Sequence, residues 1–111
     1  MTKQEVAALI RETFPIFRAH PEKWTRDSLI KRENGVTKFC VMGGATVLSV
    51  AKAGLDYKFS DLSYLYNPIP RKLYDAMGGL LGSDIANANN DAFDVEDMIT
   101  RVEAILKEQG L

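Results

Sequence analysis

The sequence is poor in the side chains that bind metals and form disulfides. It contains one cysteine, Cys40, and one histidine, His20. A single cysteine cannot form a disulfide within the chain, and one Cys with one His needs several added carboxylates to complete a zinc site. We therefore predict no internal disulfide, no metal and no cofactor.

Long apolar runs are also missing. Residues 1–14 contain no uninterrupted apolar stretch of the kind that a secretory signal needs. The longest weakly polar stretch, residues 36–55, is broken by Lys38 and Lys52 and contains Gly43 and Gly44, so it is not expected to span a membrane. These absences predict a cytoplasmic protein that does not contact a membrane.

Neither sign of charge is in excess over the whole chain. The 14 basic and 15 acidic residues give a net charge of −1, so there is no electrostatic footprint for nucleic acid, and we expect none to bind. With 111 residues, 46% hydrophobic and 26% charged, the composition is that of an ordinary globular protein. A chain of this length predicts a single domain over residues 1–111.

The segment from Cys40 to Gly54 is apolar almost all the way round when it is set on a helical period. Its polar side chains Thr46, Ser49 and Lys52 recur at every third position and form one narrow stripe. A helix of this kind is buried over most of its circumference. We predict that this segment is a buried central helix ending at Gly54, a suitable C-cap residue.

Capping signals and proline positions predict three further helices. The first begins at Thr2, which forms a capping box with Glu5, and is expected to end near Thr13 because of Pro15. The second follows Pro70. The third is the amphipathic segment between the cap residue Asp94 and Gly110.

Asn34-Gly35 is the strongest signal for a β-hairpin, because both residues tolerate the positive φ angles of a type I′ turn. We predict that residues 24–31 pair with residues 36–39; a short helix from Thr25 capped by Gly35 is the alternative. Residues 83–91 are small and polar and predict irregular structure.

The expected fold is α+β and mainly α, with about four helices around a buried central helix and a small antiparallel hairpin. The residues expected in its core are Leu9, Ile10, Phe17, Val47, Leu48, Met98, Val102 and Ile105.

Cys40 is the first candidate for chemistry, because a cysteine near a helix N-terminus can become a nucleophilic thiolate. It would need a base, and His20 is the only histidine that could serve; a small buried hydrophobe is the simpler interpretation of a cysteine among apolar neighbours. The pair Gly43–Gly44 could present amides to an anion, but small residues inside an apolar helix mainly allow a neighbouring element to approach closely.

Polar and aromatic residues elsewhere are candidates for binding. Asn87, Asn89, Asn90 and Asp91 gather amides and a carboxylate before a helix N-terminus, where they could bind a polar ligand or fold back onto their own backbone. Trp24 would anchor an interface if it is exposed and would be core if it is buried. Tyr64 and Tyr66 belong to an aromatic stretch that would mark an interface if exposed.

Several of these residues follow one order along the chain. They are Trp24-Thr25, Gly35 in the following turn, Cys40 with Gly44-Ala45, and Asn90-Asp91 ahead of an amphipathic helix. In this order the chain resembles a family of small uncharacterised bacterial and phage proteins, the domain-of-unknown-function family 6197. The resemblance implies a bacterial or phage setting and no particular activity.

No catalytic pattern in the sequence is specific, so we expect a non-enzymatic accessory protein that binds a macromolecular partner. A protein is the expected partner, and a phage-encoded modulator of a host protein would fit the resemblance. Two alternatives stay open. One is a small-ligand binder or Cys-dependent hydrolase with a pocket formed by Cys40, Gly43–Gly44 and Asn90–Asp91; the other is a homo-oligomeric structural component.

Overall fold

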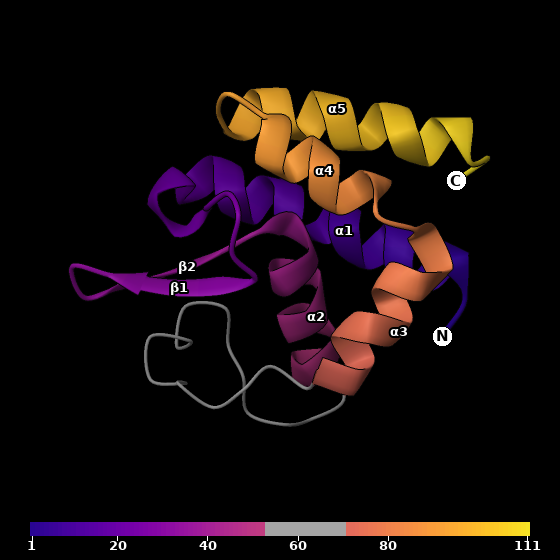
Figure 1. Ribbon diagram of the computed structural model, residues 1–111, viewed down its shortest axis with the longest axis horizontal. Helices are drawn as coiled ribbons and strands as arrows, with labels where there is room; N and C mark the ends of the chain where they lie inside the picture. Colours follow the sequence, from indigo (N-terminus) through magenta and orange to yellow (C-terminus); the bar gives the residue numbers. More distant parts are fainter. Residues whose placement is uncertain (53–70) are drawn as a thin grey trace.

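The computed structural model describes the backbone of residues 1–52 and 71–111, and the side chains of residues 1–52 and 75–111. Within these ranges it has five α-helices and one two-stranded antiparallel sheet, which confirms the predicted mainly helical α+β fold (Figure 1). None of the described helices is long and apolar enough to cross a membrane. The elements are α1 (Lys3–Ala19), a 3₁₀ turn (Pro21–Lys23), β1 (Ile30–Glu33), β2 (Val36–Phe39), α2 (Val41–Lys52), α3 (Arg71–Leu81), α4 (Asp84–Asp91) and α5 (Val95–Glu108).

Helix α2 is the buried central helix that its composition predicts. It packs against α1, α3 and α4, and α5 packs on α4 and α1. Every residue from Val41 to Val47 is buried. The expected polar stripe is only partly exposed, because Thr46 is buried and its hydroxyl donates to the carbonyl of Met42 at 2.7 Å. Gly54, the predicted C-cap, lies outside the described residues.

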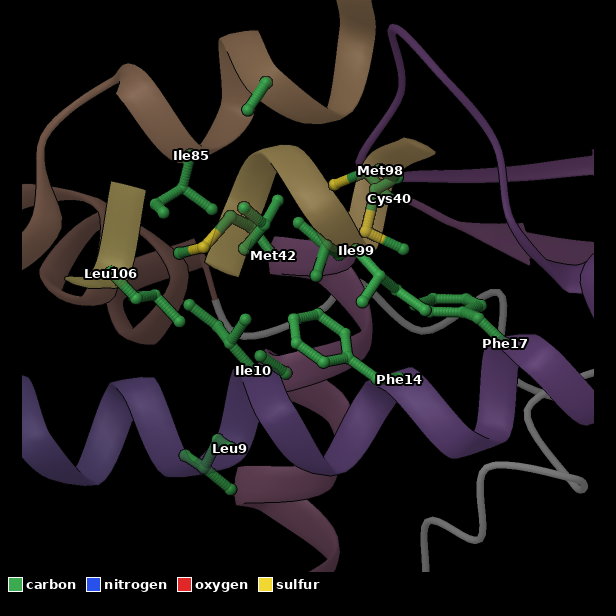
Figure 2. Packing of buried hydrophobic residues seen from close by; sticks show 14 of the residues in the cluster. Leu9, Ile10, Phe14, Phe17, Cys40, Met42, Ile85, Met98, Ile99 and Leu106 are labelled. Atoms are coloured by element: carbon green, nitrogen blue, oxygen red, sulfur yellow. The ribbon is translucent and has the colours of Figure 1, made fainter. Parts of the chain in front are cut away.

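One hydrophobic core joins α1, α2, α3, α4 and α5. Figure 2 shows Ile10, Phe14 and Phe17 of α1 pointing toward side chains of the other helices. Of the predicted core, Leu48 and Ile105 are only partly buried and pack against it. The remaining predicted core residues are buried as expected: Leu9, Ile10, Phe17, Val47, Met98 and Val102.

Helix α1 is longer than its sequence predicts. The capping box of Thr2 and Glu5 is formed, but the helix runs through Pro15 to Ala19 instead of ending near Thr13. Pro15 is exposed, so its ring faces solvent, and Phe14 and Phe17 continue the buried face on both sides of it. Burial of these two rings offsets the hydrogen bond that proline cannot donate.

Two ion pairs join α5 to α1 and show that the two helices are antiparallel. Arg11 donates from Nε and Nη2 to both carboxylate oxygens of Glu103, with a shortest distance of 2.8 Å, and Arg18 Nε lies 2.7 Å from Glu96 Oε1. Hydrogen bonding from Arg11 lowers the pKa of Glu103. Because residue numbers rise along α1 while those of their partners fall along α5, the two helices run in opposite directions.

The hairpin forms with the predicted turn but with a shorter first strand. Ile30 pairs with Phe39 and Glu33 pairs with Val36, so Asn34-Gly35 is a two-residue turn, with φ angles of 51° and 77°. The alternative helix is therefore excluded. The antiparallel pairing does not extend back to Trp24, because Asp27 has a left-handed backbone with φ of 61°. Trp24 instead forms an isolated parallel bridge with Phe39.

The prediction that residues 83–91 are irregular is wrong, because Asp84–Asp91 forms the helix α4. Ile85, Ala88 and Asn89 recur at helical spacing and all three are buried, so packing stabilises a segment whose composition favours turns. The helices predicted after Pro70 and after Asp94 are both present, as α3 and α5, and Gly110 has the positive φ of a C-cap residue.

Candidate functional site

Asn89 joins three segments that are far apart in the sequence. Its side chain is fully buried. Its Oδ1 accepts hydrogen bonds from Trp24 Nε1 at 2.8 Å and from the backbone N–H of Val41 at 3.0 Å, and its Nδ2 donates to the carbonyl of Thr25 at 3.1 Å and to Asn90 Oδ1 at 3.3 Å. These bonds use both acceptor positions and both donors of the amide. Asn89 therefore connects α4 to the Trp24 segment and to the start of α2.

The residues beside Asn89 extend the same connection. Asn90 Oδ1 accepts from the backbone N–H of Asp27 at 2.8 Å, and Arg26 Nη1 donates to the carbonyl of Ala92 at 3.2 Å. The structure thus brings the predicted binding residues Trp24, Asn89 and Asn90 together. Their hydrogen bonds are made to the protein itself, and Trp24 is half-buried. A ligand at this junction stays a prediction.

Cys40 has the environment of a structural thiol. It is 6% exposed, and its Sγ accepts a hydrogen bond from the backbone N–H of Gly43 at 3.3 Å. Burial raises the pKa of the thiol despite the nearby helix N-terminus, so the nucleophilic thiolate is disfavoured. His20, the base that catalysis would require, is exposed, and its Nδ1 lies 3.5 Å from Glu22.

Thiol labelling measures how accessible Cys40 is. In the native protein we expect Cys40 to react with a chromogenic disulfide reagent at least about a hundredfold more slowly than in the unfolded chain, because reaction requires opening of the core. The same protein in concentrated denaturant is the control. Rapid labelling under native conditions would contradict the structural role and revive the hydrolase alternative.

The two glycines after Cys40 serve close packing, as the sequence predicts. A Cβ atom on Gly43 would collide with the backbone carbonyl of Leu29, and one on Gly44 would lie 3.1 Å from the ring of Phe17. Their amides are also engaged, with Gly43 N–H donating to Cys40 Sγ and Gly44 N–H donating to the Cys40 carbonyl at 2.9 Å. Neither amide is free to bind an anion.

Phe93 is the feature that sequence reasoning missed. It is 86% exposed, between α4 and α5. It directly precedes the N-cap residue Asp94, where an apolar side chain often packs against the fourth residue of the helix, here Met98. Met98 is instead fully buried in the core while the ring of Phe93 remains in solvent. Sequence alone would have suggested that Phe93 is covered, so nothing in the pattern marked it.

The backbone around Phe93 is fixed although its ring is exposed. Phe93 N–H donates to Asp97 Oδ2 at 2.8 Å, and Asp97 N–H donates to Asp94 Oδ1 at 2.8 Å. The hydrogen bond from Phe93, with a second from Arg101, lowers the pKa of Asp97. Because hydrogen bonds hold the backbone at Phe93, less backbone entropy is lost when the ring enters an interface.

The other residues predicted as site residues, and the surface hollows, do not add to a site. Asp91 is exposed at the end of α4, and Tyr64 and Tyr66 lie outside the described residues. Among the described side chains, no three His, Cys, Asp or Glu residues are grouped as metal ligands would be. Surface hollows of about 280 and 290 Å³ lie beside Leu9 and Met42 respectively, and neither is lined by Cys40, Asn90 or Asp91.

No family model, no curated protein and no solved structure matches this chain. The resemblance in motif order to the uncharacterised bacterial and phage family therefore stays a prediction.

Proposed function

We propose that this chain is a non-enzymatic accessory protein that binds a macromolecular partner, a protein, in the cytoplasm of a bacterial cell. A phage-encoded modulator of a host protein is the form of this function that the motif resemblance favours. The observation that carries the proposal is the exposed ring of Phe93 on a hydrogen-bonded backbone.

Two other findings support a binding role over a catalytic one. The only thiol is buried and its pKa is raised. The amide of Asn89 is saturated by hydrogen bonds within the protein. Phe93, in contrast, makes little use of its apolar surface in the fold, and transferring such a ring from water into a partner's pocket gains roughly 1.5–3 kcal/mol.

Position-specific crosslinking tests this function. A photoreactive phenylalanine analogue at position 93, in protein expressed at native level in a bacterial host, is expected to form a discrete adduct with a partner protein upon irradiation. The same analogue at the position of Lys107, which is exposed on α5, is the matched control and should give none. Equal adducts at the two positions, or none at either, would contradict the proposal.

The substitution Phe93→Ala supplies the quantitative test. We expect it to weaken binding of the crosslinked partner by about thirtyfold, the effect of an interface residue worth about 2 kcal/mol. The free energy of unfolding should change by less than about 0.5 kcal/mol, because an exposed ring contributes little to the fold. A variant that loses stability instead would show that the ring serves the fold.

A further inference from the structure

The surface around Phe93 carries carboxylates that the protein does not neutralise. Although the whole chain is nearly neutral, residues 76–100 contain no Lys, Arg or His. The same stretch contains five acidic residues: Asp84, Asp91, Asp94, Glu96 and Asp97. Phe93 lies between two of them, Asp91 and Asp94, which are both exposed. We call Asp91, Phe93 and Asp94 the Phe93 surface.

Three arginines approach this region, but each has another partner. Arg18 of α1 is paired with Glu96, and Arg101 of α5 is paired with Asp97 at 3.0 Å. Arg26 donates to the carbonyl of Ala92.

Within the described part of the chain, neither Asp91 nor Asp94 forms an ion pair. Asp27, whose backbone is held by Asn90, adds another exposed carboxylate beside α4. Asp91 and Asp94, the two charged residues of the Phe93 surface, therefore have no ion-pair partner among the described residues, and this surface is negative.

We propose that the Phe93 surface docks into an apolar pocket bordered by Lys and Arg side chains on a protein partner. This inference rests on the proposed function and adds the chemistry of the partner. The ring of Phe93 fills the pocket, and Asp91 and Asp94 meet the basic border. Complementary charge of this kind raises the association rate and excludes partners of the wrong sign. Phosphates of nucleic acid or of an anionic membrane are repelled by the same carboxylates.

The probe for this proposal is a displayed library of random peptides, selected on the immobilised full chain at low salt and counter-selected on Phe93→Ala. Enriched peptides are expected to combine an apolar residue with neighbouring Lys or Arg. A synthesised enriched peptide should bind Phe93→Ala about thirtyfold more weakly than the wild-type protein. Raising the salt concentration should weaken its binding, because the charged contacts lie at an exposed border.

Variants that remove charge distinguish the contribution of the charged contacts from the contribution of the Phe93 ring. The double variant Asp91→Asn and Asp94→Asn should weaken binding of the same peptide by about tenfold, whereas Asp84→Asn, which removes an exposed charge at the opposite end of α4, should change it by less than about twofold. Asp94→Asn keeps an N-cap side chain, so the fold is preserved, and circular dichroism and thermal unfolding verify this.

Each other outcome overturns the inference. Enriched peptides without basic residues, or binding that is insensitive to salt and to the double variant, would exclude the basic border while leaving the proposed function intact if Phe93→Ala still weakens binding. Binding that is independent of Phe93, or the absence of any enriched peptide, would remove the ring as an anchor and with it the proposed function. Sedimentation of the wild-type protein as an oligomer that Phe93→Ala dissociates would identify a second copy of this chain as the occupant.

Discussion

Replacing Asn89 by alanine is expected to lower the free energy of unfolding by about 3 kcal/mol. The substitution leaves three partners without their bond: the indole N–H of Trp24, the backbone N–H of Val41 and the carbonyl of Thr25. Each buried polar group that loses its partner costs about 1–3 kcal/mol, and part of that cost is recovered if water enters. Domains of this size are stable by only about 5–15 kcal/mol, so the loss is a large fraction of the total. Urea unfolding followed by circular dichroism measures it.

Asn87→Ala is the matched control for this prediction. Asn87 lies on the same helix, is exposed, and precedes Asn89 by two residues. Its replacement removes the same side chain without breaking a tertiary bond to any residue that the structure describes, so the free energy of unfolding should change by less than about 0.5 kcal/mol. Equal destabilisation by the two variants would show that α4 depends on its asparagines for local reasons and that the junction contributes little.

Gly43→Ala is the second substitution with a large expected effect. The added methyl group would collide with the backbone carbonyl of Leu29, which also accepts a hydrogen bond from the N–H of Cys40 at 3.3 Å. A backbone carbonyl cannot rotate away as a side chain can. The start of α2 and the backbone at Leu29, just before β1, must therefore move apart. We expect a loss of about 3 kcal/mol in the free energy of unfolding, despite the better helix propensity of alanine.

Alanine substitutions at two other glycines serve as comparisons for the stability change expected of Gly43→Ala. A Cβ on Gly44 would meet the ring of Phe17 and a methyl of Thr13 at 3.1 and 3.3 Å, contacts that side-chain shifts can relieve in part. A Cβ on Gly79 of α3 meets nothing within 4 Å. Gly79→Ala should therefore stabilise the protein by about 0.5–1 kcal/mol, and Gly44→Ala should lie between the two. If Gly43→Ala were as stable as Gly79→Ala, the close approach to Leu29 would not exist.

The features that the sequence predicted correctly depend on residues a few positions apart. The capping box of Thr2 and Glu5 and the turn at Asn34-Gly35 are determined by local backbone geometry, which short stretches specify. The wrong predictions came where tertiary packing opposed a local signal. The proline at position 15 is tolerated because the helix on both sides of it buries phenylalanine, and α4 forms because one face of a polar segment enters the core.

The asparagine cluster shows the same limit within the candidate site. The sequence pointed to Asn87, Asn89, Asn90 and Asp91 together, but it did not indicate that Asn89 is the one with a saturated, fully buried amide. The i, i+4 spacing of Ile85 and Asn89 would have indicated which asparagine faces the core, had the segment been read as a helix. The exposure of Phe93 could not be predicted, because the same position before an N-cap is commonly covered by its own helix.

The hydrogen bond between Trp24 and Asn89 also gives the molecule an intrinsic optical reporter. Trp24 is the only tryptophan of the chain. Its indole N–H is bound to Asn89 of α4, which also accepts from the backbone N–H of Val41 at the start of α2. Its fluorescence therefore reports on one defined place, whereas circular dichroism averages over all helices. A shift in tryptophan emission that precedes the loss of helical signal would mean that α4 separates from α2 before the helices unfold, and coincident changes would mean that the junction and the helices unfold as one cooperative unit.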